Sequence, residues 1–386
     1  MMSFDAATLT RALVQVPSVT PDAGAALDLV QGWLEPRGFA CRRLVFEADG
    51  TPDVDNLFAR IGTGSPHFCF AGHLDVVPPG DVAAWSVPPF SAEIENGRLI
   101  GRGAEDMKGG VAAFLAAVIA RVDADHHESA GSISLLLTGD EEGPAVNGTK
   151  KVLDWMAKND HLPDHCLVGE PTCVDSFGDV AKIGRRGSLN GHLKIVGHQG
   201  HVAYPDRAAN PIPVAMQMLQ TLIADLDDGT EHFAPSNLQI TSVDTANPAT
   251  NIIPAKTEAR FNCRFNDLWN AATLEAELRR RLGVIDLGGI TWTLETSSNA
   301  ESFITPTGSF TDLVSAAVKE ATGTVPALTT GGGTSDARFV TRYCPVIEFG
   351  LVGRTMHQVD ENVSLADLEK LASVYQLILE RYFQAN

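Results

Sequence analysis

The sequence is short of positive charge. Its 386 residues include 29 lysines and arginines against 48 aspartates and glutamates, which gives a formal net charge of -19. Nucleic acids and anionic membrane surfaces attract basic proteins, so this balance argues against either of them as a partner. It does not argue against a small anionic substrate, because a local pocket can carry the opposite sign to the whole chain.

A hydrophobic run long enough to cross a membrane is also missing. The longest helix-like apolar run covers residues 111–120 and ends at Arg121. It is well short of the ~20 residues that a bilayer requires. The start, MMSFDAATLTRALVQ, has no basic segment followed by an apolar one, as a secretory signal would have. We therefore expect no secretory signal and no membrane partner.

Cysteine is sparse and scattered. Its positions are 41, 69, 166, 173, 263 and 344, and no two of them have CxxC spacing. With 44% hydrophobic residues, a chain of this length can build a large core and needs no disulfides to hold it. Reduced thiols in a cytoplasmic protein are the simplest interpretation.

What the sequence does contain, over its first half, is an alternation of strand and helix patterns. Two short apolar runs ended by glycine, HFCFAG and SISLLLTG, are typical of buried strands. Between them, GGVAAFLAAVIARV is typical of a helix. Strand, helix and strand at this spacing predict an α/β fold with a mainly parallel sheet.

The pattern changes near Ile183 and returns near Ser302. The strand-like segments GSLNGHLKIVGH, SNLQITSV and AKTEARFNCRF are interleaved there with two helical patterns. They predict a compact α+β unit of about a hundred residues, a common domain size. We therefore expect a main domain made of residues 1–182 and 297–386, with a second domain inserted at residues 183–296.

Acidic residues gather where predicted strands end. His73 and Asp75 follow the first apolar run, and the three acids of LTGDEEG follow the second. Glu170 follows a further run in CLVGEPT, and Asp106 in GRGAEDMKGG comes just before a helix. The carboxyl ends of parallel strands share one crevice, so these four segments converge. A solvated loop explains one such acidic segment well and four of them poorly.

A crevice with five carboxylates needs cations, because like charges packed together are unfavourable. Histidine and carboxylate ligands suit zinc and related divalent ions, whereas a thiolate site would need cysteines that are absent from these segments. The four charges of two divalent ions would be balanced by the carboxylates of Asp75, Asp106, Glu142 and Glu170. Glu141 is then left over beside the metals, in the position of a general base for the attacking water.

Rival interpretations are weaker. GGGTSDA comes near the serine-hydrolase motif, with Ser335 as nucleophile, but the preceding strand is weak and Asp336 is too close to serve a triad. A dinucleotide-binding fold from GRGAED fails for lack of the third glycine. A metal-dependent binding protein without catalysis would have no use for a spare carboxylate at position 141.

Longer motifs occur in order along the chain: GHLDVVPPGDVAAWSVPPFSAEIENGRLIGRGAEDMKGG, TGDEEG, GEPT, GRRGS, GHVAYP, NIIPA, GGGTSDARF and RTMHQVDENV. Over nearly the whole chain they resemble the M20 family of dinuclear zinc amidohydrolases. GHLDVVP and DEEG fit many members of that family. GHVAYP, and GGGTSDARF with TMHQVDENV, favour the branch that converts N-succinyl-LL-2,6-diaminopimelate and water to succinate and LL-2,6-diaminopimelate.

The resemblance implies roles for the matching residues. Two zinc ions, which cobalt can replace, would be held by His73, Asp106, Glu142, Glu170 and His357. His73 and Glu170 would bind different ions, and Asp106 would bridge the two. Glu142 would bind one ion, and His357 would complete the other. Asp75 would orient His73. Glu141 would act as the base, and His201 would reach the substrate carbonyl from a partner subunit.

The inserted segment, by the same resemblance, would be a ferredoxin-like lid and dimerisation domain, and the protein a cytoplasmic homodimer with a small-molecule substrate. Substrate-binding roles fall to Arg185, Tyr204, Asn251, Arg264, Thr334 and Arg338. A lone arginine is more often a structural charge, and Tyr204 could simply pack. His198 departs from the family pattern, which has an apolar residue before QGH. An acetylornithine-type deacetylase or an aminopeptidase of the same family stays open as an alternative.

Overall fold

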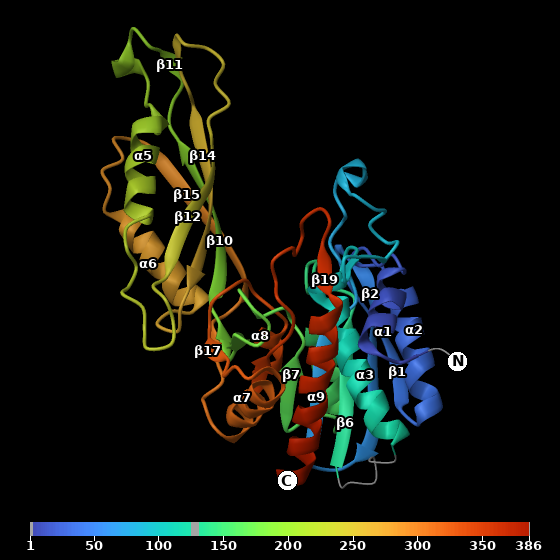
Figure 1. Ribbon diagram of the computed structural model, residues 1–386. Coiled ribbons are helices and arrows are strands. Elements are labelled where there is room, and N and C mark those ends of the chain that lie inside the picture. Colours follow the sequence, from blue (N-terminus) through green and yellow to red (C-terminus); the bar gives the residue numbers. More distant parts are fainter. Residues whose placement is uncertain (1–2, 125–130, 386) are drawn as a thin grey trace. The chain divides into compact units, whose positions relative to one another are not determined.

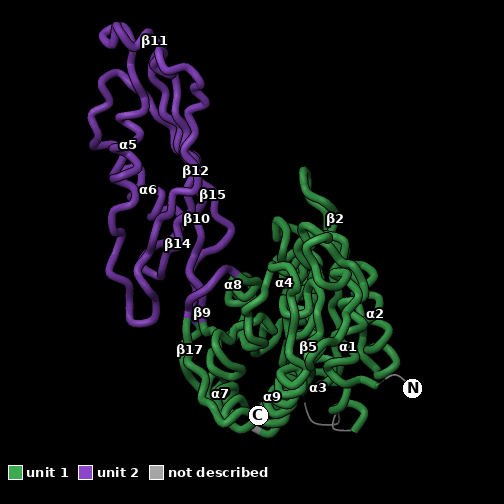
Figure 2. Tube along the Cα trace, turned by 45° about the horizontal axis from the view of Figure 1, so that its top comes forward, with its two compact units in different colours: residues 1–183, 305–329, 335–386 green, residues 184–304, 330–334 purple. Residues whose placement is uncertain are grey.

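The computed structural model describes residues 3–124 and 131–385, and the chain forms two compact units (Figure 2). The first is made of described residues from Met1–Ile183, Thr305–Thr329 and Ser335–Asn386, and the second of Gly184–Ile304 and Thr330–Thr334. The inserted segment therefore runs on to Ile304, past the expected end at residue 296. The reason is that β15 (Thr291–Ala300) and β16 (Phe303–Ile304) pair with strands of the second unit.

The first unit is built on a sheet with the strand order β1-β2-β6-β3-β7-β18-β8-β17 (Figure 1). Its strands are β1 (Ala40–Ala48), β2 (Thr51–Thr63), β3 (His67–His73), β6 (Gly131–Thr138), β7 (His165–Val168), β8 (Val180–Lys182), β17 (Ala327–Thr329) and β18 (Val346–Glu348). The central strands β6, β3, β7 and β18 are parallel, and β1 and β2 join them antiparallel. The predicted α/β class with a mainly parallel sheet is confirmed.

Helices surround this sheet. They are α1 (Ala6–Val14), α2 (Gly24–Leu34), α3 (Gly109–Asp123), α4 (Thr149–Lys158), α7 (Ser309–Thr322), α8 (Ala337–Val340) and α9 (Leu365–Ala385), with short turns η1 (Glu35–Arg37), η2 (Val82–Ala84) and η3 (Ala104–Lys108). α3 is apolar on nearly every face because it packs against α1, α9 and β3. Within the described ranges, no helix is long and apolar enough to span a membrane.

A small sheet of β4 (Glu93–Glu95), β5 (Arg98–Ile100) and β19 (Asn362–Ser364) ties the end of the chain to the middle of the first unit. β19 pairs with β5 so that Asn362 lies opposite Ile100. This pairing brings the segment before β19 next to the segment after β5. Two loops that are far apart in sequence thereby become neighbours.

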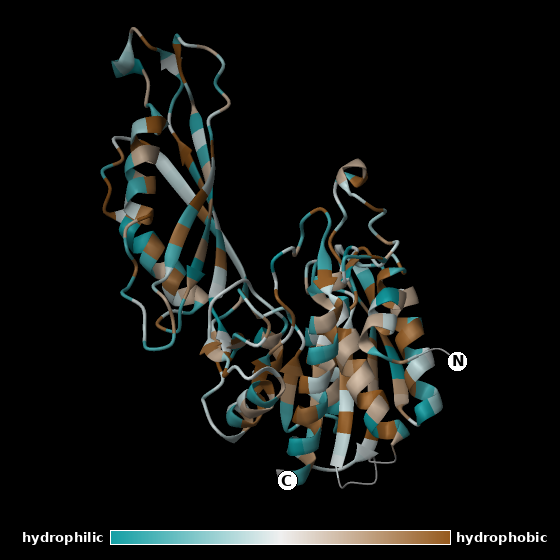
Figure 3. Ribbon diagram, viewed as in Figure 1, coloured by the Kyte–Doolittle hydropathy of each residue, from teal (hydrophilic) through white to brown (hydrophobic). Residues whose placement is uncertain are grey.

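The second unit follows the order β10 (Gly187–Val196), α5 (Pro211–Leu222), β12 (Asn237–Asp244), β14 (Lys256–Phe265), α6 (Ala271–Gly283) and β15. Its sheet has the order β12-β14-β10-β15 with antiparallel neighbours, which is the expected ferredoxin-like α+β fold. Hydrophobic and hydrophilic residues alternate along these strands (Figure 3), and Leu189, Leu193 and Phe261 belong to the buried core with residues of α5 and α6. The unit also contains two short strand pairs and a turn. β9 (Gly184–Arg185) pairs with β16, and β11 (Gly200–His201) pairs with β13 (Ile252–Ile253). The turn is η5 (Pro205–Arg207).

The register of the first sheet places the predicted site. His73 at the end of β3 lies opposite Thr138 at the end of β6, and Ala71 of β3 lies opposite Val168 at the end of β7. The segments that follow these strands therefore leave the sheet at one edge, where ligands of such folds bind.

Candidate metal centre

His73 is buried within the site and is only 1% exposed. Its Nδ1 lies 2.9 Å from the main-chain oxygen of Asp75, so this nitrogen carries the proton and donates it. Its Nε2 lies 3.3 Å from Oδ1 of Asp106 and 3.8 Å from Oε1 of Glu170. In the neutral ring Nε2 offers a lone pair to carboxylate oxygens, an arrangement that is favourable only with a cation between them.

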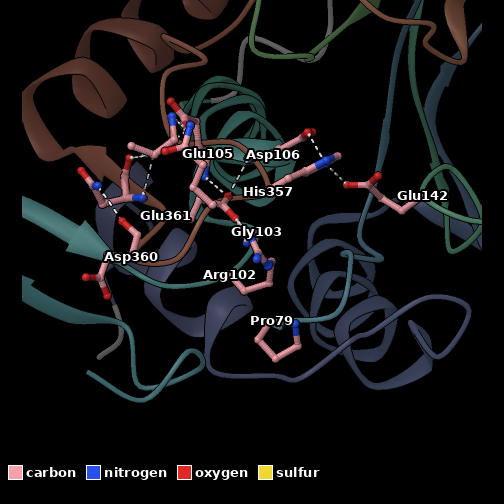
Figure 4. Close-up of polar contacts among 12 residues, drawn as sticks. Pro79, Arg102, Gly103, Glu105, Asp106, Glu142, His357, Asp360 and Glu361 are labelled. Atoms are coloured by element: carbon pink, nitrogen blue, oxygen red, sulfur yellow. Dashed lines mark hydrogen bonds and ion pairs between the residues drawn. The ribbon is translucent and has the colours of Figure 1, made fainter. Parts of the chain in front are cut away.

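His357 faces the other side of Asp106 (Figure 4). Its Nε2 lies 3.3 Å from Oδ2 of Asp106 and 2.9 Å from Oε1 of Glu142. Hydrogen bonds to Asp106 and then Glu142 raise the pKa of His357 to about 10. Burial alone would raise the pKa of Asp106, but hydrogen bonds with His357 and His73 lower it below its ordinary value. Only in their protonated form can the two imidazoles neutralise these acids, a role that metal ions could take instead.

These side chains form two groups that share one residue. One consists of His73, Asp106 and Glu170, and the other of Asp106, Glu142 and His357. The donor separations, 3.3 and 3.8 Å in the first group and 3.3 and 2.9 Å in the second, are close to the roughly 3.3 Å expected between neighbouring ligand atoms of one tetrahedral zinc ion. Asp106 turns Oδ1 to His73 and Oδ2 to His357, as a bridging ligand would. The donor set therefore fits two divalent ions.

One detail differs from the expected assignment. The resemblance put His73 and Glu170 on different ions, but they belong to the same group, because Glu170 follows β7, the neighbour of β3, and its Oε1 is 3.8 Å from Nε2 of His73. It also put Glu142 and His357 on different ions, but they share the other group, with Oε1 of Glu142 2.9 Å from Nε2 of His357. A further group of three donors joins His73, Glu141 and Glu142. Glu141 thus lies beside the two groups and belongs to neither.

The carboxylate of Asp75 lies closer to the main chain of the acidic loop than to the ring of His73. Its carboxylate accepts the main-chain N–H of Glu141 at 3.3 Å and that of Glu142 at 3.1 Å, whereas its Oδ1 is 3.7 Å from Nδ1 of His73. Burial raises the pKa of Asp75 to about 6. Its main-chain oxygen and its carboxylate together fix one metal-ligand candidate and the two glutamates of the loop.

Glu141 has the environment of a base. Burial, followed by the charge of Glu170, raises the pKa of Glu141 well above its ordinary value. Arg338 on α8 is 7% exposed, and its Nη1 lies 3.9 Å from Oε1 of Glu141. Nε and Nη1 of Arg338 have no hydrogen-bond partner among the described residues. Buried donors without a partner are costly, so this arginine is suited to an acceptor supplied by a ligand.

Ser335 is not placed to act as a nucleophile. It is 0% exposed, and its Oγ donates to Oε1 of Glu348 at 2.8 Å. A nucleophilic serine needs access to substrate and a histidine base. The burial of Ser335 therefore disfavours a serine hydrolase.

The remaining predicted residues lie in the second unit, at two places. His201 lies opposite Ile252 in the β11–β13 pair, and its ring centroid is 5.6 Å from that of Tyr204. The main-chain oxygen of Asn251 accepts the N–H of Val202 at 3.1 Å, so these residues gather at one loop cluster.

The second place is near the start of β10. Arg185 lies in β9 and donates from Nη1 to the main-chain oxygen of Gly333 at 3.2 Å, next to Thr334. Arg264 in β14 lies opposite Ser188 of β10. Arg185 and Arg264 thus both lie near the start of β10, although β9 pairs with β16 in a separate small sheet.

Two carboxylates of the site were missed in the sequence. Glu105 and Glu361 are 2% and 0% exposed, and they hold the loops that carry Asp106 and His357 (Figure 4). The only feature of the sequence that pointed to them is that each acid stands within four residues of a predicted metal ligand. An acid in that position is also what a solvated loop would contain, so the sequence did not single them out.

With this geometry, comparisons with known proteins are informative. The model of peptidase family M20/M25/M40 matches residues 69–381. The succinyl-diaminopimelate desuccinylase of Rhodospirillum centenum is 55% identical over 383 residues, which cover 99% of this chain and 98% of that protein. Among solved structures, an M20 family metallo-carboxypeptidase from Sulfolobus solfataricus has a TM-score of 0.78 at 18% identity and covers 97% of this chain and 98% of its own. A dinuclear metal binding peptidase of the M20 family from Bacillus subtilis has a TM-score of 0.71 at 16% identity, with 98% and 97% covered.

Proposed function

Because the chain belongs to peptidase family M20/M25/M40, we propose that it is a metal-dependent amide hydrolase that converts N-succinyl-LL-2,6-diaminopimelate and water to succinate and LL-2,6-diaminopimelate. The observation that carries the proposal is the pair of ligand groups that share Asp106, with Glu141 beside them. The choice of substrate is supported by relatives over nearly the full chain that are named succinyl-diaminopimelate desuccinylase.

The groups would hold two zinc ions, for which cobalt can substitute. His73, Asp106 and Glu170 would hold one, and Asp106, Glu142 and His357 the other. When bound, such ions lower the pKa of water and polarise a carbonyl oxygen. The Bacillus subtilis relative of this fold, described as dinuclear, supports the number of ions.

In the reaction, Glu141 would take a proton from the attacking water and return it to the leaving amine. Its raised pKa suits this exchange, because a base is most effective when its pKa lies near the working pH. Asp75 would keep Glu141 in place through the main-chain hydrogen bond described above. His201, contributed by a second copy of the chain, would donate a hydrogen bond to the developing oxyanion.

The substrate carries three carboxylates, and the chain itself is strongly acidic. Each carboxylate must therefore be met locally, and arginine suits it because its paired donors fit the group. We assign this role to Arg185, Arg264 and Arg338, with Tyr204, Asn251 and Thr334 as further contacts. The donors of Arg338 that have no partner support its place in this set.

We place the enzyme in the cytoplasm as a homodimer joined through the inserted domain. The described cysteines form no disulfide, as suits a reducing compartment. A dimer is required if His201 acts across subunits. The subunit-mixing experiment in the Discussion tests this assembly.

A substrate panel tests the proposed reaction. Purified protein with added zinc is offered N-succinyl-LL-2,6-diaminopimelate, N-acetylornithine and dipeptides, and kcat/KM is measured for each. We expect the succinyl substrate to exceed the others by at least tenfold. A higher value for the acetyl compound would make the protein an acetylornithine-type deacetylase, and a higher value for dipeptides would make it an aminopeptidase. Either result would overturn the proposed substrate.

A further inference from the structure

Two buried carboxylates next to the metal centre have no part in the reaction proposed above. Glu105 comes directly before Asp106, and Glu361 comes four positions after His357. Both are almost fully buried, at 2% and 0% exposure. A buried carboxylate is stable only when it is well paired or hydrogen-bonded, so the partners of each show what it holds.

Glu361 holds the backbone of the loop that carries Asp106. Its Oε1 accepts the main-chain N–H of Glu105 at 2.9 Å and that of Asp106 at 3.1 Å. Its Oε2 accepts the N–H of Gly103 at 3.0 Å and Nη1 of Arg102 at 2.7 Å. One side chain from the His357 segment thus fixes three peptide N–H groups of the loop, one of which belongs to the bridging ligand Asp106 itself (Figure 4).

Glu105 holds the backbone of the segment that carries His357. Its Oε1 accepts the main-chain N–H of Arg354 at 2.7 Å. Its Oε2 accepts both the N–H of Thr355, at 2.7 Å, and the hydroxyl of Thr355, at 2.6 Å. These groups lie two and three positions before His357. A side chain from the Asp106 loop therefore fixes the segment that presents His357.

We propose that Glu105 and Glu361 are positioning residues that cross-brace the two metal-ligand loops. Each carboxylate stands on one loop and accepts its hydrogen bonds from the other, so the two loops hold each other in place. The brace sets the position of His357 relative to Asp106, whose Oδ2 lies 3.3 Å from Nε2 of His357. This inference rests on the proposed function, in that both loops are taken to bind metal.

Asp106 and His357 differ in the number of ligand groups to which they belong, so loosening each loop should affect the zinc affinities differently. Asp106 belongs to both groups, whereas His357 belongs to one. Loosening His357 should weaken the binding of one ion, and loosening Asp106 should weaken both. A general role in stability would not separate the two ions in this way. Groups that orient metal ligands typically contribute 10–100-fold in metal affinity.

Glu105→Gln and Glu361→Gln test the inference. Each keeps the shape of the side chain, but its amide group turns a donor toward main-chain N–H groups that already donate. Metal is stripped with a chelator, and the stepwise zinc affinities are measured by competition with a chromophoric chelator. Circular dichroism verifies the fold. We expect Glu105→Gln to weaken one step by about 10–100-fold and leave the other within about threefold, and Glu361→Gln to weaken both steps by about 10–100-fold.

Asp227→Asn is the matched control. Asp227 also accepts main-chain N–H groups, those of Gly229 at 2.9 Å and Ser236 at 3.1 Å, but it lies in the second unit. We expect both of its zinc affinities to equal those of the wild type. If Glu105→Gln does not fold, Thr355→Val is a milder test, because it keeps the main-chain donors to Glu105 and removes the hydroxyl, which donates to Glu105 at 2.6 Å and accepts the N–H of Asn362 at 3.1 Å. It should weaken the same single step.

Metal binding is measured without substrate, so the brace and the proposed reaction can fail separately. Wild-type affinities in folded Glu105→Gln and Glu361→Gln, or in Thr355→Val, would overturn the brace even if the succinyl substrate is hydrolysed. Selective loss of one step in Glu105→Gln would uphold the brace even if the substrate panel finds another amide. Equal weakening of both steps by every variant, including Asp227→Asn, would also overturn it.

Discussion

In the first unit His73 lies buried between Asp75 and Asp106, whereas in the second unit His201 lies exposed at the end of β11. Both ring nitrogens of His73 have neighbours at 2.9 to 3.3 Å. For His201, Nδ1 accepts the N–H of Ala203 at 3.0 Å, a contact within its own turn. The first unit therefore gathers its candidate metal ligands in a buried cluster, and the second presents His201 to solvent. Under the proposed function, the first unit provides the metal ligands and the base, and the second provides side chains that contact the substrate.

The largest expected effect is on kcat, and it tests the role of Glu141 as the base. Glu141→Ala should retain both metal ions and lower kcat by roughly 10²–10⁴-fold, because it removes a general base and leaves both ligand groups intact. Glu142→Ala is the matched variant next to it, and it should lose one ion. Metal content by elemental analysis and kcat are measured for both. If Glu141→Ala loses metal and Glu142→Ala retains it, the base and the ligand have been assigned the wrong way round.

The second effect concerns His201. His201→Ala should lower kcat by roughly 10²–10³-fold, the usual result of removing an oxyanion donor. Mixing it with Glu141→Ala under conditions of subunit exchange should restore activity, because a heterodimer then contains one site with neither change. Exchange is verified by native mass spectrometry. Absence of recovery despite exchange would place His201 in the site of its own subunit or outside catalysis.

The arginines test recognition. Arg185→Ala, Arg264→Ala and Arg338→Ala should each weaken transition-state binding of the succinyl substrate by roughly 2–5 kcal/mol, if each leaves a buried carboxylate unpaired. The kcat/KM values are compared with those for the N-acetyl analogue, which lacks one carboxylate. The arginine that reads the succinyl carboxylate should lose most of its effect with the acetyl compound. Equal losses on both compounds for all three variants would remove the physical support for a succinyl-specific site.

The smallest effects concern stability. In metal-free protein, Asp75→Ala should lower the free energy of unfolding by roughly 1–3 kcal/mol, because the N–H groups of Glu141 and Glu142 lose their acceptor. His201→Ala and Tyr204→Phe should change it by less than about 0.5 kcal/mol, because both side chains are exposed. Urea unfolding monitored by circular dichroism measures all three. A loss with His201→Ala as large as that with Asp75→Ala would contradict the contrast between the units.

The parts of the fold and site that follow local rules could be predicted from the sequence. Apolar runs ended by glycine indicated β3 and β6, and the rule for ligand positions in parallel sheets brought His73, Asp106 and Glu170 to one edge. The α/β class is confirmed for the same reason, since periodicity and chain order determine it. The patterns of the insertion indicated only an α+β unit, and its ferredoxin-like strand order was implied by the family resemblance.

Features that depend on long-range pairing could not be predicted. Glu105 meets Thr355 across 250 positions, and a sequence contains no signal for such a contact. The end of the inserted segment at Ile304 depends on the pairing of β16 with β9, two strands of only two residues each. The placement of His73 and Glu170 in one group required the strand order, because β7 adjoins β3 in space and not in sequence.

Stepwise reconstitution with metal tests whether hydrolysis depends on two metal ions per chain. The protein is stripped of metal by chelation, its metal content is verified by elemental analysis, and zinc or cobalt is added in measured amounts while hydrolysis of N-succinyl-LL-2,6-diaminopimelate is followed. We expect no activity in the stripped protein and recovery with either ion, complete at two ions per chain. Full activity in protein that contains no transition metal would contradict it.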